Sequence, residues 1–342
     1  GDFIGVVPCM SGHAQIETAI ALTDVTVISV KKEQYPELIA QNTPLALKII
    51  KSFASRMRTM NDILAQLTLN NISSNTAEQI FRTAEYYDNA GLMDIAVFAY
   101  YQYLKTKPQG SNAEMAKKRF VALKPRTHAV FYEPTADLTR EYPKDTMIFS
   151  ESQSGAEMFI IQEGQVSISK VVDGKEVTLA LLKQGDMFGE MALLEHKPRS
   201  ASAIAHTDCR LMVVNRSNFD QMVSTQPQLI SRLTTTLADR LWSMYRQIEN
   251  AYLKDPVHKM IDMISLQVEK QKIKCDRPNV QWQSDLTAQD IVNMCGIPAN
   301  LAPKAVYDFQ NLSFIKIIDG KILVKDCYEV SKQAAFFKKT GK

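Results

Sequence analysis

The stretch Gly185–Ala205, GDMFGEMALLEHKPRSASAIA, decides how the rest of the chain is interpreted. It combines a glycine turn, a carboxylate at Glu190, a short apolar run and the segment Pro198-Arg199-Ser200. Small residues let the backbone approach a ligand, amide N–H groups at the start of a one-turn helix can face a phosphate, and an arginine can offset its charge. Because a carboxylate accepts hydrogen bonds from sugar hydroxyls, the pattern predicts a site for an anion that also carries a sugar.

This stretch resembles the phosphate-binding cassette of cyclic-nucleotide-binding domains, as found in the catabolite activator and FNR-type regulators and in cyclic-nucleotide-dependent kinases. The segments F-G-E-M-A-L-L and P-R-S-A-S-A match that family pattern at every chemically committed position. The resemblance implies that Glu190 holds a ribose hydroxyl, while Arg199 and Ser200 hold the cyclic phosphate. Further ligand contacts are expected from the small and apolar neighbours in the cassette: Gly189, Met191, Ala192 and Ala201. The alternative is a pocket no longer used, in which Glu190 and Arg199 form only an ion pair.

The composition of the 342 residues is that of a globular protein with several domains, 45% hydrophobic and 23% charged. A net charge of +3 gives no general attraction to nucleic acid or membranes. The five cysteines are scattered without metal-site spacing, which indicates reduced thiols in a cytoplasmic protein and no metal. No apolar run is long enough to span a bilayer, so no membrane partner is expected. Since the chain begins at Gly1 without a methionine, we expect further residues upstream.

Residues 1–58 form an internal repeat of the central stretch. Laid without gaps, Gly1–Arg58 aligns with Gly185–Trp242, and glycines, alanines and charged residues coincide along the alignment. Self-similarity at a fixed period indicates a duplicated structural unit. The sequence therefore predicts an α+β multidomain protein with two antiparallel β-rolls, of which the first is present only in part.

The first copy lacks the polar groups of the cassette. Its residues at the three ligand positions are uncharged: Val6 for Glu190, Gln15 for Arg199 and Ile16 for Ser200. Burying a phosphate anion beside isoleucine without a cation would cost on the order of several kcal/mol. We therefore expect the first copy to be a scaffold or a dimerisation module that binds no nucleotide.

Residues 59–125 are expected to form a helical connector. Ile63–Leu67 continues the preceding helix, Asn70–Asn75 is rich in turn-forming residues, and two helices follow. Their small and aromatic residues resemble one tetratricopeptide-like unit: Ala84, Tyr87, Ala90, Gly91, Ala96, Tyr100, Leu104 and Pro108. Because such arrays need about three repeats to be stable alone, we favour a helical spacer over a protein-docking surface.

Residues 126–253 are expected to form the intact nucleotide domain. Glu157–Val166 predicts a strand that turns at Glu163-Gly164, and Val171–Val177 predicts a hairpin with Asp-Gly at its tip. Short strands separated by regular turns and closed by helices are typical of an antiparallel β-roll.

A long helix is predicted after Pro227, within residues 226–253. Its apolar residues recur at alternating three- and four-residue steps, which indicates a heptad-like seam. The seam predicts either a homodimer, or pairing of the two copies within one chain, or core packing. In the resembling family this helix also touches the nucleotide base, and the positions concerned align with Met244 and Tyr245. We expect that Tyr245 could stack on a purine, which leaves the base preference open.

Residues 255–342 resemble the C-terminal winged helix-turn-helix of the same family. Leu286–Ile297 matches the first helix and its glycine turn, with Thr287 as the expected N-cap. Ala302–Leu312 predicts the second helix, and Phe314–Lys325 predicts a hairpin turning at Asp319-Gly320.

The residues expected to read DNA depart from the family pattern. Where the recognition helix usually opens Ser-Arg-Glu, this chain has Pro298-Ala299-Asn300, and alanine cannot replace an arginine bidentate to guanine. Residues 255–342 contain 13 basic against 10 acidic residues, which is a small excess for a DNA-binding domain. Asn300 and Lys304 are the candidates for contacts with double-stranded DNA.

Two functions are consistent with these patterns. The first is a cyclic-nucleotide-sensing transcription regulator, with cyclic AMP as the first choice of ligand and cyclic GMP or a cyclic dinucleotide behind it. The alternative is a signalling adaptor that kept the sensor but whose winged helix no longer reads DNA. The sequence argues against an enzyme, because the five histidines show no catalytic spacing and no nucleoside-triphosphate loop is present.

Overall fold

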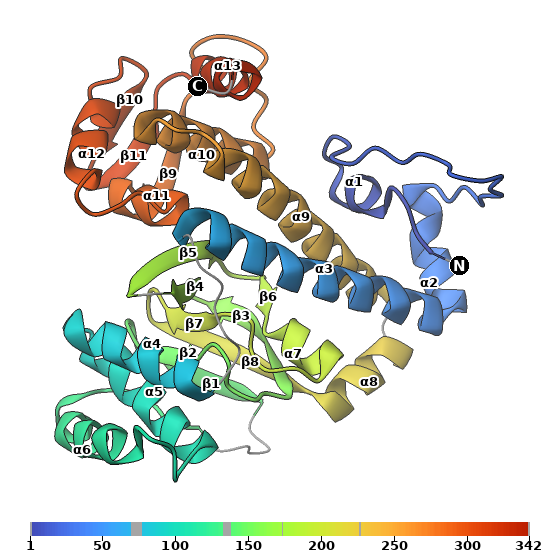
Figure 1. Ribbon diagram of the computed structural model, residues 1–342. Helices are drawn as coiled ribbons and strands as arrows, with labels where there is room; N and C mark the ends of the chain where they lie inside the picture. Colours follow the sequence, from blue (N-terminus) through green and yellow to red (C-terminus); the bar gives the residue numbers. More distant parts are fainter. Residues whose placement is uncertain (1, 70–76, 133–137, 173, 226, 341–342) are drawn as a thin grey trace. The chain divides into compact units, whose positions relative to one another are not determined.

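The computed structural model describes residues 2–69, 77–132, 138–172, 174–225 and 227–340 (Figure 1). The chain divides into two compact units, each described here by itself. The first comprises Gly1–Asn61, Ser74–Ile168 and Leu181–Trp242, and the second comprises Asp62–Ser73, Ser169–Ala180 and Ser243–Lys342. Within the described ranges, none of the helices is both long and apolar enough to cross a membrane.

The N-terminal part of the first unit is helical. α1 spans Val6–Ser11, a 3-10 turn spans Lys32–Gln34, α2 spans Tyr35–Gln41 and α3 spans Thr43–Leu69. Residues 12–31 contain neither helix nor strand, so the expected partial β-roll of residues 1–58 is not seen as strands in residues 2–58. The physical reason is that a strand exists only by hydrogen bonding to a neighbour, and the aligned repeat supplies no neighbouring strands.

The helices of the two copies nevertheless keep a common spacing. α7 (Glu190–Glu195) and α9 (Pro227–Ala251) begin 184 residues after α1 and α3, from position 6 to 190 and from 43 to 227. Both short helices have six residues and start after a left-handed glycine, Gly5 with φ 70° and Gly189 with φ 79°. The helix starts and the N-cap glycines therefore share the 184-residue spacing of the predicted repeat, and the duplication itself stays a prediction.

Three helices follow in residues 77–123: α4 (Ala77–Asn89), α5 (Met93–Thr106) and α6 (Ala113–Leu123). The sequence predicted only two of them. Of the eight predicted positions, Ala84, Tyr87, Ala96 and Tyr100 are buried, each at most 2% exposed, in the two helices that contact each other, α4 and α5. Leu104 is half-buried, and the other three positions, Ala90, Gly91 and Pro108, are exposed. α5 ends one residue before Lys107-Pro108, as predicted. The expected turn at Asn70–Asn75 lies outside the described residues, and the tetratricopeptide-like assignment stays a prediction.

The strands of residues 139–215 form two four-stranded sheets, with orders β1-β8-β3-β6 and β2-β7-β4-β5. Figure 1 shows them in green and yellow, with α5 against β2. The predicted turn at Gly164 and the predicted β4–β5 hairpin are present, although Asp173 at its tip lies outside the described residues. The strand bounds are β1 (Thr139–Tyr142), β2 (Met147–Phe149), β3 (Glu157–Glu163), β4 (Val166–Val172), β5 (Lys175–Leu182), β6 (Met187–Phe188), β7 (Ser202–Ala205) and β8 (Cys209–Asn215).

The long helix α9 follows α8 (Arg216–Thr225), and its predicted apolar seam is buried. Ile230, Leu233, Leu237 and Leu241 are each at most 3% exposed. Part of the cover comes from the N-terminal helices of the same unit, because the Tyr35 hydroxyl donates to Thr234 Oγ1 at 3.1 Å. The first copy thus packs on α9 of the second copy within one chain.

The C-terminal part of the second unit contains four helices and a three-stranded antiparallel sheet of order β10-β11-β9. Thr287 is the N-cap of α11, as predicted, and forms a reciprocal capping box with Asp290. The predicted hairpin turn at Asp319-Gly320 is present, with φ 51° and 77°. The bounds are α10 (Pro256–Lys270), β9 (Trp282–Thr287), α11 (Ala288–Cys295), α12 (Ala302–Gln310), β10 (Ile315–Ile318), β11 (Lys321–Val324) and α13 (Cys327–Thr340).

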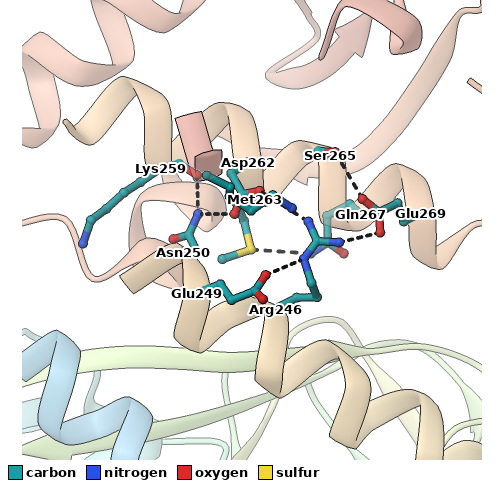
Figure 2. Close-up of polar contacts among 10 residues, drawn as sticks. Arg246, Glu249, Asn250, Lys259, Asp262, Met263, Ser265, Gln267 and Glu269 are labelled. Atoms are coloured by element: carbon teal, nitrogen blue, oxygen red, sulfur yellow. Dashed lines mark hydrogen bonds and ion pairs between the residues drawn. The ribbon is translucent and has the colours of Figure 1, made fainter. Parts of the chain in front are cut away.

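A buried polar network joins the end of α9 to α10 (Figure 2). Asp262, 1% exposed, accepts from Arg246 Nη2 at 3.3 Å and from Asn250 Nδ2 at 3.0 Å. Arg246 Nη1 also donates to Glu269 at 2.5 Å, and Lys338 of α13 lies 3.4 Å from Asp262. Because a buried charge that loses its partner is costly, this network holds the two helices in one arrangement.

Candidate functional site

The cassette is built from β6, α7 and the loop that leads into β7. Gly189 bends the chain between β6 and α7 in the left-handed conformation, φ 79°, where its missing side chain avoids strain. Glu190, Met191 and Ala192 form the first turn of α7, whose backbone N–H groups have no partner within the helix. Gly189 has no side chain, so the N-cap residue accepts no side-chain hydrogen bond from these amides.

Arg199 is the central group of the site. It is 4% exposed, and its guanidinium carbon lies 4.1 Å from the centroid of the Phe149 ring. Nη1 donates to the Gly189 carbonyl at 2.7 Å, whereas Nε is buried and has no hydrogen-bond partner among the residues that the structure describes. Burial lowers the pKa of Arg199 to about 10, against the opposing effect of the carboxylates of Glu157 and Glu190. The side chain therefore stays a cation at neutral pH.

No carboxylate among the described residues forms an ion pair with Arg199, because the two nearby acids have other partners. Glu157 accepts from both terminal nitrogens of Arg140, at 2.8 and 2.9 Å. Glu190 Oε1 lies 3.4 Å from Arg240 Nη1. The alternative of a Glu190–Arg199 ion pair is therefore not what the structure contains. Burying a cation without a counter-ion costs free energy. An anion that binds beside Arg199 would therefore be stabilised.

Two glycines make room for the Arg199 guanidinium. A methyl group on Gly155 would lie 2.5 Å from Arg199 Nε, and one on Gly189 would lie 2.7 Å from Nη1. Either distance is far shorter than a van der Waals contact, so any side chain at these positions would displace the guanidinium. The backbone of Arg199 is fixed as well, since its N–H donates to Gln153 and its carbonyl accepts from Ser152, both at 2.9 Å.

Glu190 is 2% exposed and is held by Arg240 of α9, which the sequence analysis did not identify as a site residue. Arg240 also donates to the carbonyl of Met187, so it ties the long helix to the start of the cassette. The signal was present in the sequence, because Arg56 and Arg240 coincide in the repeat. It was not informative, since arginines on exposed helix faces are common.

The remaining cassette residues lie where the sequence predicted them. Ser200 is 8% exposed, and its hydroxyl donates to Met191 Sδ at 3.5 Å. Because a thioether sulfur is a weak acceptor, this contact leaves the hydroxyl available to a ligand. Ala192 and Ala201 are buried and keep the backbone accessible at close range. The structure therefore brings Gly189, Glu190, Met191, Ala192, Arg199, Ser200 and Ala201 together in one unit.

The other predicted residues belong to the second unit. Tyr245 is half-buried on α9, and its role against a base stays a prediction. Asn300 lies exposed in the turn before α12, and Lys304 is exposed on α12 itself. α12 begins only at Ala302 and carries Pro303 in its first turn, where a missing N–H is tolerated. The same helix region exposes two apolar side chains, Leu301 at 44% and Tyr307 at 62%.

The part of the chain that the structure describes contains no group of three or more acidic, histidine or cysteine side chains placed to hold a metal ion. The five cysteines, including the buried Cys209, Cys295 and Cys327, are all unpaired thiols. Burial raises the pKa of the Cys209 thiol, so this sulfur is not an activated nucleophile.

Comparison with protein families places this site in a known domain type. Residues 139–226 match the family model described as "Cyclic nucleotide-binding domain". The matched residues run from β1 through α8 and include Glu190, Arg199 and Ser200. The residues expected to read DNA lie outside the match.

Several curated relatives are named as cAMP-activated transcriptional regulators. A "CRP-like cAMP-activated global transcriptional regulator" of Mycobacterium tuberculosis is 24% identical over 195 residues, 57% of this chain and 87% of that protein. The "Cyclic AMP receptor protein" of Thermus thermophilus is 36% identical over 103 residues, 30% of this chain and 48% of that protein. A solved structure of a CooA mutant from Carboxydothermus hydrogenoformans has a TM-score of 0.49 at 19% identity, covering 57% of this chain and 87% of that one.

Proposed function

We propose that the protein is a cyclic-nucleotide-responsive transcription regulator whose second copy, residues 126–253, binds the nucleotide. Arg199 and Ser200 hold the cyclic phosphate, Glu190 accepts a hydrogen bond from the ribose, and the amides of Met191 and Ala192 complete the anion site. Cyclic AMP is the first choice of ligand, in line with the names of the relatives. Cyclic GMP and cyclic dinucleotides are the competing ligands.

The observation that carries this proposal is the buried Arg199 cation, which has no carboxylate partner and an Nε without a hydrogen bond. Its nearest acids are already neutralised by Arg140 and Arg240. An entering phosphate would supply the missing charge, and the glycines beside the guanidinium leave space for it to move toward a ligand.

The signal would reach the C-terminal elements through α9. Near the middle of this helix Arg240 holds Glu190, and toward its C-terminal end Arg246 and Asn250 hold Asp262 of α10. A ligand that competes for Glu190 changes the contacts of Arg240 and thereby biases the seating of α9. Residues 255–342 then act as a winged helix-turn-helix that contacts double-stranded DNA through Asn300 and Lys304.

The adaptor function has one observation in its favour, which is the exposure of Leu301 and Tyr307 on the α12 region. An apolar face of this kind suits a protein partner better than a phosphate backbone. Binding to random duplex DNA at low salt separates the two functions. A regulator binds and is released as salt rises, whereas an adaptor does not bind at any salt concentration.

We also propose that residues 1–58 are a degenerate copy of the nucleotide domain that pairs with the intact copy inside one chain. The common 184-residue spacing of helices and the Tyr35–Thr234 hydrogen bond support this arrangement. The first copy would then take the place that a second subunit has in a dimer.

The test is a thermal shift experiment with cyclic AMP, cyclic GMP and cyclic di-GMP on the wild type, Arg199→Ala and Gln15→Ala. A ligand at a hundred times its dissociation constant adds about 2.7 kcal/mol, which moves the midpoint by a few degrees. We expect one nucleotide to shift the wild type and Gln15→Ala equally and to leave Arg199→Ala unshifted. An equal shift in all three variants would overturn the site assignment.

A further inference from the structure

Arg58 lies on α3 of the first copy and contacts the cassette of the second copy. Its Nε donates to Glu195 Oε2 at 2.7 Å, and its Nη1 donates to the Pro198 carbonyl at 3.0 Å. Arg58 is 8% exposed and the Glu195 side chain is also 8% exposed, so water screens this pair little. All three residues belong to the first unit.

The two acceptors lie on either side of the turn that shapes the ligand loop. Glu195 is the last residue of α7, and His196 follows in the left-handed conformation with φ 55°. Pro198 directly precedes Arg199, so Arg58 holds the carbonyl of the peptide bond that leads into the phosphate-binding arginine. On the other side the Arg199 backbone is held by Ser152 and Gln153. The loop is thus fixed before and at Arg199 by two separate elements.

The matching position of the second copy makes a different contact. Trp242 aligns with Arg58, 184 residues later, and its ring stacks on His13 with centroids 3.6 Å apart. His13 lies just after α1, as Lys197 lies just after α7. Each long helix therefore contacts the loop that follows the short helix of the other copy, as a two-fold related pair would.

The contact to the loop with Arg199 and Ser200 differs in chemistry from the contact to the loop with Gln15 and Ile16. The loop that carries Arg199 and Ser200 is held by a charged, bidentate donor, which fixes both position and direction. The loop that carries Gln15 and Ile16 is held at the His13 side chain, by stacking on Trp242 and by a 3.5 Å contact with Asp239. Arg58 instead holds a backbone carbonyl of its loop, directly before the arginine that has to meet a ligand in a particular geometry.

We propose that Arg58 is a positioning residue for nucleotide binding, contributed by the degenerate copy to the intact copy in the same chain. It touches no ligand. By fixing Glu195 and the Pro198 carbonyl it sets the loop so that Arg199 and Ser200 reach the cyclic phosphate. This inference rests on the proposed function, and it assigns the first copy a share in ligand affinity although its own cassette is inactive.

The experiment measures the dissociation constant of cyclic AMP by titration calorimetry on the full 342-residue chain. Arg58→Met keeps the aliphatic length and removes both donors, and we expect affinity to fall about tenfold, within the usual range of coupling between contacting residues. Arg58→Lys keeps the charge but not the bidentate geometry, so we expect a smaller loss. Arg56→Met is the matched control, because Arg56 is an arginine on the same helix whose ion pair is with Glu17 of the N-terminal segment.

A double-mutant cycle separates positioning from simple stabilisation. Arg58→Met, Glu195→Gln and the double variant are compared for nucleotide affinity and for the thermal midpoint without ligand. We expect the two substitutions to be coupled in affinity, so that the double variant binds about as weakly as Arg58→Met alone. If Arg58→Met does not fold, the cycle uses Arg58→Lys in its place together with Glu195→Gln, with the same two measurements.

The outcomes distinguish this inference from the function on which it rests. If the wild type binds none of the nucleotides, the proposed function and the inference both fail. If the wild type binds and Arg58→Met binds equally well, the inference alone is overturned. If affinity and midpoint fall together in Arg58→Met and in Arg56→Met, the effect is general destabilisation and the inference is also overturned.

Discussion

The two short helices α1 and α7 have the same length, the same left-handed glycine before them and a fixed distance of 184 residues between them, from position 6 to 190. One is followed by Pro198-Arg199-Ser200 with a buried cation, whereas the other is followed by a segment with Gln15 and Ile16 at the matching positions. The comparison teaches that a short helix and its N-cap glycine can be present where the charged side chains of the cassette are absent. Helix position and cap depend on local residues, whereas the anion site depends on three side chains.

The contrast continues downstream of the short helices. Residues 202–215 form β7 and β8 within two sheets, whereas the aligned residues 18–31 form no strand. Leu211 of β8 is 0% exposed, and Val27 at the matching position is 66% exposed. A similar apolar pattern is thus core in one copy and surface in the other, because burial requires neighbouring strands.

The largest expected effect on stability contrasts these two matched positions. Leu211→Ala removes a fully buried side chain and should cost about 2–5 kcal/mol of unfolding free energy. Val27→Ala should stay within about 0.5 kcal/mol of the wild type, because the residue is already in water. Denaturant unfolding of both variants measures the difference. Equal costs would mean that residues 18–31 are packed in solution as β8 is.

The next effect concerns the cassette residues themselves. Giving the second copy the residues of the first, Glu190→Val with Arg199→Gln, should weaken cyclic nucleotide binding at least about a hundredfold, since a buried hydrogen-bonded charge contributes several kcal/mol. The matched control, Val6→Ala with Gln15→Ala in the first copy, should leave affinity unchanged. Titration calorimetry checks both. A large loss in the control would show that the first copy also binds a ligand.

A smaller effect is expected at the matched glycines. Gly189→Ala forces a side chain into the left-handed region and against Arg199, whereas Gly5→Ala meets the same φ with nothing within 4 Å. We expect about 1 kcal/mol of destabilisation for Gly5→Ala and about 2 kcal/mol for Gly189→Ala. Only Gly189→Ala should also reduce nucleotide affinity. Thermal unfolding with and without ligand gives both values.

The smallest effect is expected where the two copies differ by one hydroxyl. Tyr35 aligns with Phe219, and both side chains are buried, at 5% and 2% exposed. Tyr35→Phe removes the hydrogen bond to Thr234 and should cost about 1 kcal/mol of unfolding free energy. No change in the unfolding midpoint would indicate that this contact between α2 and α9 does not form in solution.

Much of the fold could be predicted from the sequence where local rules decide. The Asp-Gly turn at Asp319-Gly320, the Thr287 cap and the buried seam of α9 each depend on residues within a few positions of one another. The missing strands of residues 18–31 could not be predicted, because strand formation depends on neighbours that are distant in sequence. The third connector helix α6 was not predicted. The Asn112 side chain at its N-cap makes no capping hydrogen bond.

For the candidate site, the sequence pointed to side chains within the cassette but not to the arginines that contact it from other elements. Glu190, Arg199 and Ser200 were found because a cassette pattern places them close in sequence. Arg240, Arg140 and Arg58 were not found, since each reaches the site from a separate element. Their roles depend on which carboxylate or carbonyl each arginine meets in the folded chain, and spacing in the sequence does not carry that information.

One retained cassette per chain has a consequence for the shape of the response. A symmetric pair of sites can bind its second ligand more or less tightly than its first, which makes the response steeper or shallower. A chain in which one half binds and the other half only supports has no second site within the pair. Under the proposed function, and for a chain that does not pair with a second chain, occupancy rises as a simple hyperbola with messenger concentration. Such a protein would report the level of its messenger in graded fashion and not as a threshold.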